Sequence, residues 1–232
     1  FSLVCDKAVW FASAVVISSD RRIKTDIEDS NTEMDLNIIK NIELKHYSYI
    51  DKRERGIDEV EGFIAQQIYD VYPEAVTIGE DYIPDIFKKA KSFIVTPNLT
   101  VTSNLTNSLI TIELDEAHNL VKDTKIRLDI ITAKQNDENN RVEVSTNPFF
   151  VNVLEVIDED KFNSVVLVEG EILNIRVYGR FVTDFHTIDK QRIFCVNVGA
   201  TQELAKRVEQ LQTDNQVLKT ENEQLKTQLS QF

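Results

Sequence analysis

Hydrophobic and polar positions near the start of the chain predict a helix between residues 30 and 42. Ser30 and Glu33 have the Ser-x-x-Glu spacing of a capping box, in which two side chains satisfy free backbone amides at a helix start. Met34, Ile38 and Ile42 then recur at helical spacing. We therefore expect a short helix with these three residues on its apolar face.

The following segment mixes strand and helix patterns. Side chains over 44–50 fall into two alternating sets, which is strand spacing. A second short helix fits 64–71, and Pro73 ends it. The front of the chain is therefore expected to form a small α+β unit.

From about residue 88 to residue 180 the pattern becomes that of short strands. Apolar and polar residues alternate around Ile112, Leu128 and Val144, and polar breaks occur at 136–140 and 158–160. Repeated short strands with polar turns predict a β-rich insert that forms a sandwich or an open barrel. The pattern leaves the strand order open.

The end of the chain carries a heptad pattern. Its core positions alternate in steps of four and three: Leu204, Val208, Leu211, Asn215, Leu218, Asn222, Leu225, Leu229 and Phe232. Because the other faces are polar, this spacing favours a coiled coil over a helix packed on its own domain. Asn in core positions lowers stability and restricts register and strand number. The pattern predicts an oligomer and leaves open whether it is a dimer or a trimer.

Composition narrows the class of protein. The chain has 232 residues and a formal net charge of −13, so it repels phosphate backbones and a nucleic-acid partner is disfavoured. It starts with Phe1, and we expect it to be the C-terminal part of a longer protein. Its longest apolar stretch, 8–17, has about half the length that a bilayer requires. The β-branched and aromatic content of this stretch predicts the end of an upstream β-structure, with no membrane segment.

Metal and cofactor chemistry has little support in the sequence. Cys5 and Cys195 are far apart, cannot build a metal site alone and do not require an oxidising compartment. His46, His118 and His186 share no ligand spacing. We expect neither a metal nor a cofactor.

Candidate chemistry lies at Ser19 and Lys24. A serine nucleophile needs a base, and a lysine can be that base where burial lowers its pKa towards neutrality. Five residues apart, the two side chains can meet across a turn or a helix start. The same spacing is common by chance. Taken alone, it is explained more simply by Ser19 or Asp20 capping a helix and a solvated Lys24.

Several motifs together point to one family. In chain order they are Ser-Asp-x-Arg-x-Lys at 19–24, Leu-x-x-Tyr-x-Tyr at 44–49, Gly-Phe-Ile-Ala-Gln at 62–66 and Tyr-Pro at 72–73. The set resembles the intramolecular chaperone auto-processing domain. This family forms the C-terminal end of bacteriophage endosialidase tailspikes and neck appendages, and it occurs in the myelin regulatory factor class of self-cleaving proteins.

The later part of the chain resembles members from large DNA viruses in particular. The segments that carry this likeness are Tyr178-Gly179-Arg180, Asp184-Phe185-His186 and Ala200-Thr201-Gln202-Glu203-Leu204. The resemblance covers roughly 18–86 and 178–232, and the β-rich insert lies outside the minimal family pattern.

The resemblance implies a homotrimer, held by the C-terminal coil, that aligns an upstream fibre and then cuts itself off with a Ser-Lys dyad. Ser19 carries over as the nucleophile and Lys24 as its general base, while Asp20 and Arg22 are assigned to holding the site together. Attack on the Ser18 carbonyl closes a five-membered ring, so self-attack favours the Ser18–Ser19 bond. Attack between copies leaves the Ser19–Asp20 bond possible. Such a protein acts in the virion or in the host cytoplasm during assembly.

We expect an α+β chain with five zones. They are the end of an upstream fibre (1–18), the first part of the chaperone core (19–87), the β-rich insert (88–180), a return to the core (181–200) and the coiled coil (201–232). Two other functions stay open. One is a non-catalytic trimeric tail, and the other is a binding module formed by the insert.

Overall fold

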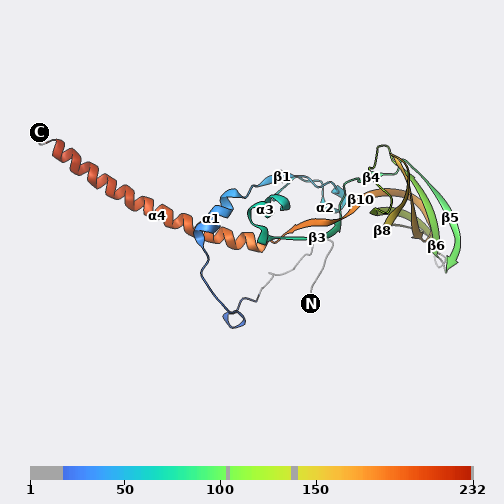
Figure 1. Cartoon of the computed structure of the whole chain (residues 1–232), viewed down its shortest axis with the longest axis horizontal. Coiled ribbons are helices and arrows are strands. Elements are labelled where there is room, and N and C mark those ends of the chain that lie inside the picture. The colour runs from blue at the N-terminus through green and yellow to red at the C-terminus, as the bar shows by residue number, and fades with distance from the viewer. Residues whose placement is uncertain (1–17, 103–104, 137–140, 231–232) are drawn as a thin grey trace. The chain divides into compact units, whose positions relative to one another are not determined.

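The protein folds into two compact units that each combine distant parts of the chain. The structure, a computed structural model, describes residues 18–102, 105–136 and 141–230 (Figure 1). The helical unit comprises 60–77, 186–230 and the residues up to Tyr47, and the sheet unit comprises 48–59 and 78–185. The presence of both helices and strands confirms the expected α+β class. The domain boundaries expected from the sequence stay predictions.

The helical unit contains most of the helices. Its elements are η1 (Arg21–Ile23), α1 (Thr32–Asn41), β1 (Lys45–Tyr47), β2 (Val60–Gly62), α3 (Ala65–Val71), η2 (Pro73–Ala75) and α4 (Lys190–Leu229). The helix predicted over 64–71 is confirmed as α3. The strand predicted over 44–50 is shorter, because only β1 pairs, with β2.

The start of α1 differs from the prediction by one residue. Asn31 caps the helix, its Oδ1 accepting a hydrogen bond from the Met34 amide at 3.1 Å. The Ser30 hydroxyl donates to Asp35 Oδ2 at 2.7 Å instead of capping the helix. The capping box centred on Ser30 is therefore wrong. Met34 is also 61% exposed, whereas Ile38 of the predicted face is buried, together with Leu36.

Close packing of α1 on the first turns of α4 organises the helical unit (Figure 1). Gly199 lies against the buried Asp35 carboxylate, which occupies the space that a side chain at position 199 would need. Polar contacts flank this point: Thr32 donates to Glu203 at 2.9 Å, and Arg207 donates to the same carboxylate at 3.0 Å. Arg207 first, and then Thr32, lower the pKa of Glu203 below its ordinary value.

A small apolar core joins α3 to the base of α4. Ile68, Ala75 and Ile193 are buried together. The α4 helix begins beside this core, where the Asp189 amide donates to the Ala75 carbonyl at 2.8 Å and the Asp189 side chain caps α4. The first turns of α4 are thus fixed to the motif-bearing part of the chain.

Most of the sheet unit is one large antiparallel sheet, with the short helix α2 (Lys52–Arg55) beside it. Its strands are β3 (Val76–Tyr82), β4 (Lys88–Lys89), β5 (Ser92–Thr102), β6 (Leu105–Glu113), β7 (Lys125–Asn136), β8 (Arg141–Asp158), β9 (Lys161–Val168) and β10 (Glu171–Ile188). The spatial order is β3-β10-β7-β8-β9-β6-β5, and β4 pairs with β10.

The long strand β8 turns this sheet around its core. Its first part pairs with β7 as far as Asn152, and its second part, from Val153, pairs with β9. The alternation predicted from the sequence is confirmed where the apolar residues of β6 and β7 are buried in this core. Val142 and Val144 of β8 are exposed instead. For this region the sequence predicts a sandwich or an open barrel. The structure shows one continuous sheet, and its two arms share β8.

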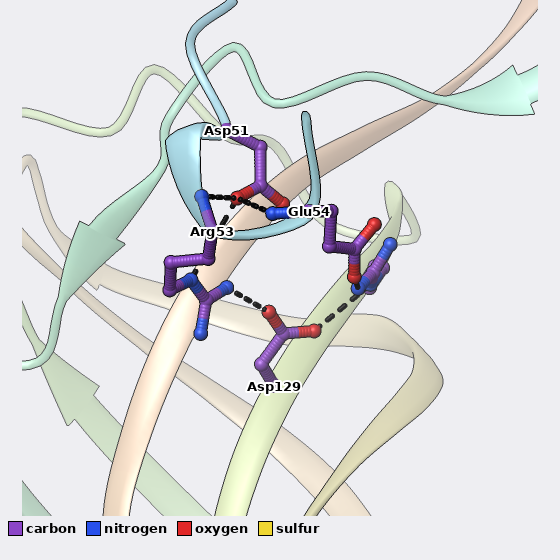
Figure 2. A network of polar contacts seen from close by, with 5 residues as sticks. Asp51, Arg53, Glu54 and Asp129 are labelled. Atoms are coloured by element: carbon purple, nitrogen blue, oxygen red, sulfur yellow. Dashed lines mark hydrogen bonds and ion pairs between the residues drawn. The ribbon is translucent and has the colours of Figure 1, made fainter. Parts of the chain in front are cut away.

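A charged network holds residues 48–59 against the sheet (Figure 2). Asp51 caps α2 by accepting from the amides of Arg53 and Glu54. Arg53 donates to Asp129 Oδ2 at 2.6 Å, and Arg127 donates to Asp129 Oδ1 at 2.8 Å and to Glu54 at 2.7 Å. Asp129 is only 4% exposed, so two guanidinium groups neutralise a carboxylate that has little access to water.

We expect Asp129→Asn to destabilise the sheet unit by roughly 3–5 kcal/mol, because the change removes the buried carboxylate that two partly buried guanidinium groups share. Chemical denaturation followed by circular dichroism measures this loss. Glu116→Gln is the control, since Glu116 forms an exposed pair with Lys88 and its loss should cost less than about 1 kcal/mol. Equal midpoints for the two variants would contradict this account.

We expect Gly199→Ala to destabilise the helical unit by about 1–3 kcal/mol, because the added methyl group meets the Asp35 carboxylate and forces α1 away from α4. Gly79→Ala is the matched control, since nothing lies within 4 Å of the corresponding position. Thermal unfolding of both variants checks the difference. A Gly199→Ala protein as stable as the control would show that α1 can move without cost.

Candidate active site

The candidate site is a single turn at the start of the described chain. Asp20 begins the turn, and its side chain accepts a hydrogen bond from the Arg22 amide at 2.8 Å. The Lys24 amide donates to the Arg21 carbonyl at 3.1 Å, which closes the turn η1. These are all local hydrogen bonds, so the turn follows from its own short sequence.

The turn brings Ser19 and Lys24 together. Lys24 Nζ donates to Ser19 Oγ at 2.6 Å, within hydrogen-bonding distance of a nucleophile and its base. Both residues and the neighbouring Ser18 are exposed. Their assignment as nucleophile, base and cleavage position stays a prediction.

Asp20 and Arg22 form a second pair beside them. The Arg22 guanidinium donates through Nε to Asp20 Oδ1 at 3.0 Å and through a terminal nitrogen to Oδ2 at 2.8 Å. This planar, two-point geometry is typical of a strong arginine–carboxylate pair. The side-chain bonds from Arg22, followed by its backbone amide, lower the pKa of the Asp20 carboxyl. The pair therefore fixes the turn between Ser19 and Lys24 while Asp20 is ionised.

The other motif segments meet in the helical unit. In the β1–β2 pair, Lys45 lies opposite Gly62 and Tyr47 lies opposite Val60. A side chain at Gly62 would meet the Tyr47 ring, with the hydroxyl 2.9 Å from its first carbon. Phe63, which follows Gly62, packs on the core around Ile68. Pairing of β1 with β2 thus joins the Leu-x-x-Tyr and Gly-Phe-Ile-Ala-Gln motifs.

Sequence reasoning missed two arrangements near the motifs. It did not anticipate that Asp35 is buried against Gly199, or that Asp129 of β7 is buried by two arginines. Asp129 belongs to the polar set of its strand, and periodicity alone gives no reason for its burial. The only local signal is the arginine two residues before it on the same face.

Some sequence predictions cannot be followed in the structure. The expected end of an upstream fibre, 1–18, lies outside the described residues except for Ser18. Cys5 and Phe232 lie outside them as well. Within the described ranges, no three histidine, cysteine or acidic side chains gather as a possible metal site. No helix in that part of the chain is long and apolar enough to cross a bilayer.

Comparison with known proteins agrees with the motifs. Residues 19–77 match the model of a peptidase family described as chaperone of endosialidase. The chain is also 28% identical over 222 residues to uncharacterized protein VP1 of Micromonas pusilla reovirus (isolate Netherlands/2005). That alignment covers 84% of this chain, and the chain spans only 12% of the length of the relative.

The family match begins at Ser19 and ends at the first residues of β3. It therefore contains the turn η1, the helices α1 and α3, and the paired strands β1 and β2. The four motifs between residues 19 and 73 fall inside it, and the segments between 178 and 204 lie outside it. Residues 19–77 therefore carry the similarity of this chain to the chaperone-of-endosialidase family.

Proposed function

We propose that this chain is the C-terminal intramolecular chaperone of a longer viral fibre-like protein. It aligns three copies of that protein as a homotrimer and then releases itself by cleaving its own chain beside Ser19. The observation that carries the proposal is the 2.6 Å contact between Lys24 Nζ and Ser19 Oγ inside the family segment. Similarity to a much longer reovirus protein supports the viral context. Its place of action is the virion or the host cytoplasm during assembly.

The proposed cleavage is an acyl shift followed by hydrolysis. Ser19 Oγ attacks the Ser18 carbonyl carbon through a five-membered ring, and the hydroxyl proton passes to the neutral Lys24 amine. Lys24 then gives this proton to the Ser19 amino group as the Ser18–Ser19 C–N bond breaks. Water hydrolyses the resulting ester, which leaves a Ser18 carboxylate and restores the hydroxyl. Attack by Ser19 of another copy on the Ser19–Asp20 bond is the alternative.

The exposure of the turn connects cleavage to assembly. A lysine amine is neutral near pH 7 only where burial or neighbouring positive charge lowers its pKa. Ser19 and Lys24 are both exposed in the single chain. We therefore expect cleavage to depend on cover that comes from outside this turn, and association of copies is the proposed source.

Association is proposed to occur through α4. In the single chain, the apolar side chains of the heptad pattern are half exposed or more, and they are Leu204, Val208, Leu211, Leu218, Leu225 and Leu229. An apolar stripe of this kind, interrupted at Asn215 and Asn222, supports a coiled coil between copies. The number of three copies is inferred from the resemblance of the motifs to the chaperone family. The heptad pattern by itself supports association of copies without giving their number.

The proposed chaperone role has a kinetic basis. Aligning three fibre chains without help requires non-local contacts whose loop-closure entropy must be overcome first. A coil at the end of each chain raises the local concentration of the other two chains and sets their register. After release, the persistence of the fibre rests on its barrier to unfolding.

Binding by the sheet unit is a second candidate function, which can coexist with the first. Apolar side chains are exposed on this unit, namely Ile94, Val95, Val144, Phe150, Leu154 and Leu167. A contiguous apolar patch among them would favour a surface that contacts another molecule, such as a receptor or a virion component.

We expect Ser19→Ala to abolish self-cleavage and Lys24→Gln to slow it by about a hundredfold or more, the usual contribution of a general base. The chain is expressed with an upstream tag, and the released fragment is followed by gel electrophoresis and intact mass. Arg21→Ala is the control, because Arg21 lies in the same turn and should cleave as the wild type does.

Mass analysis of the new chain end identifies the broken bond. An intact wild type, or an equal band from Ser19→Ala, would favour the non-catalytic trimeric tail.

We expect Arg22→Ala to slow cleavage by up to about a hundredfold, since loss of the pair with Asp20 lets Ser19 and Lys24 drift apart. The pKa of Asp20 should rise towards its ordinary value, which carboxyl-carbon NMR titration measures. In the wild type, Asp20 is ionised at neutral pH and its pair with Arg22 is complete. The pair is lost only as the pH falls through the lowered pKa of Asp20. Arg21→Ala should change neither the cleavage rate nor the pKa of Asp20. If Arg22→Ala also changes neither, then Arg22 does not hold the site together.

A further inference from the structure

The heptad frame of the coil continues towards the start of α4. Heptad positions are lettered a to g, and a and d form the core. With Val208 at a and Leu211 at d, counting back by sevens gives the earlier core positions, which are Phe194, Asn197, Thr201 and Leu204. The frame therefore covers the part of α4 that also packs on its own unit.

Contacts within the chain use the opposite side of this stretch. Ile193 and Ala200 at g, Val196 at c and Gly199 at f are all buried. Glu203, also at c, is bonded to Thr32 of α1. The α1 helix and the small core around Ile68 thus cover the c, f and g positions of α4.

The a, d and e positions of the same stretch face away from these contacts. Phe194 at a is 60% exposed, and Val198 at e is 43% exposed. Asn197 and Thr201 are exposed as well. No described residue of the same chain buries this side. A phenylalanine held in the core register with most of its surface in water indicates a contact that the single chain lacks.

The polar residues of this stretch are compatible with such a contact. The Thr201 hydroxyl donates to the Asn197 carbonyl at 2.8 Å within the helix, so it needs no partner from another chain. Asn215 and Asn222 make the same kind of bond, to the Leu211 and Leu218 carbonyls at 2.8 and 2.9 Å. Thr201, Asn215 and Asn222 thus each satisfy a side-chain donor within their own helix.

We propose that the interface between copies of this chain extends from the coil back to Phe194, so that the start of α4 binds α1 and α3 of its own chain on one side and other copies on the opposite side. This inference rests on the proposed association through α4. It adds that the copies meet directly beside the motif-bearing unit. The occupant of the Phe194 surface is the equivalent α4 surface of another copy.

The first test uses charge in the seam. The full chain carrying Ser19→Ala, which keeps it intact, is studied by analytical ultracentrifugation with Phe194→Glu or, as matched control, Gln202→Glu. Gln202 is exposed at b, outside the seam. We expect Phe194→Glu to weaken association at least about a hundredfold, because the carboxylate would be buried without a partner. The control should associate as the parent does.

The outcomes separate the two proposals. If Leu218→Glu dissociates the assembly while Phe194→Glu leaves its dissociation constant within about twofold, the coil stands and the extension is wrong. If the parent chain is a monomer at all concentrations, the association itself is wrong. If Phe194→Glu instead lowers the melting temperature of a dilute monomer, then Phe194 is covered by its own chain and the extension is wrong.

A crosslinking experiment gives an independent result. In the Cys5→Ser, Cys195→Ser background, Phe194→Cys should form a disulfide between copies under mild oxidation, because a positions of neighbouring helices face one another. Gln202→Cys should remain monomeric on a non-reducing gel. Equal crosslinking of the two cysteines, or none at Phe194→Cys in an associated sample, would overturn the proposal.

Discussion

Close packing of α1 on the base of α4 is the contact on which the helical unit depends. It requires a residue without a side chain at Gly199, because the Asp35 carboxylate occupies that space. Asp35 is in turn held by Ser30, and Thr32 extends the contact to Glu203. Since this packing covers one side of α4 only, the opposite side carries its apolar residues into solvent, and the same helix can serve its own unit and an assembly.

The family segment is divided between two packing environments. Residues 19–47 and 60–77 contribute to the helical unit, while 48–59 packs with the sheet unit through Asp129 and its two arginine partners. Residues 48–59 of the family segment thus belong to the same compact unit as the β-rich part of the chain, and ion pairs to Asp129 hold them there. A carboxylate with little access to water, neutralised from both sides, fixes the α2 segment on β7.

The turn that carries Ser19 and Lys24 differs from both environments, because it is organised by contacts within itself. The Asp20–Arg22 pair and the backbone bonds of η1 bring the hydroxyl and the amine together with every residue exposed. Such a turn can hold the geometry of a reaction without supplying the dry surroundings that reaction needs. In the proposed function those surroundings come with assembly, which links a local turn to the long helix at the other end of the chain.

The sequence by itself determined the features that depend on neighbouring residues. These include α3 with its proline stop, the buried alternation of β6 and β7, the helical state of the heptad segment and the reach from Ser19 to Lys24. Tertiary structure alone decided that Asn31 rather than Ser30 caps α1, that Met34 is exposed, that Asp129 is buried and that β8 joins two arms of one sheet. The reason is that periodicity reports which residues share a face, whereas the covering of a face depends on segments distant in the chain.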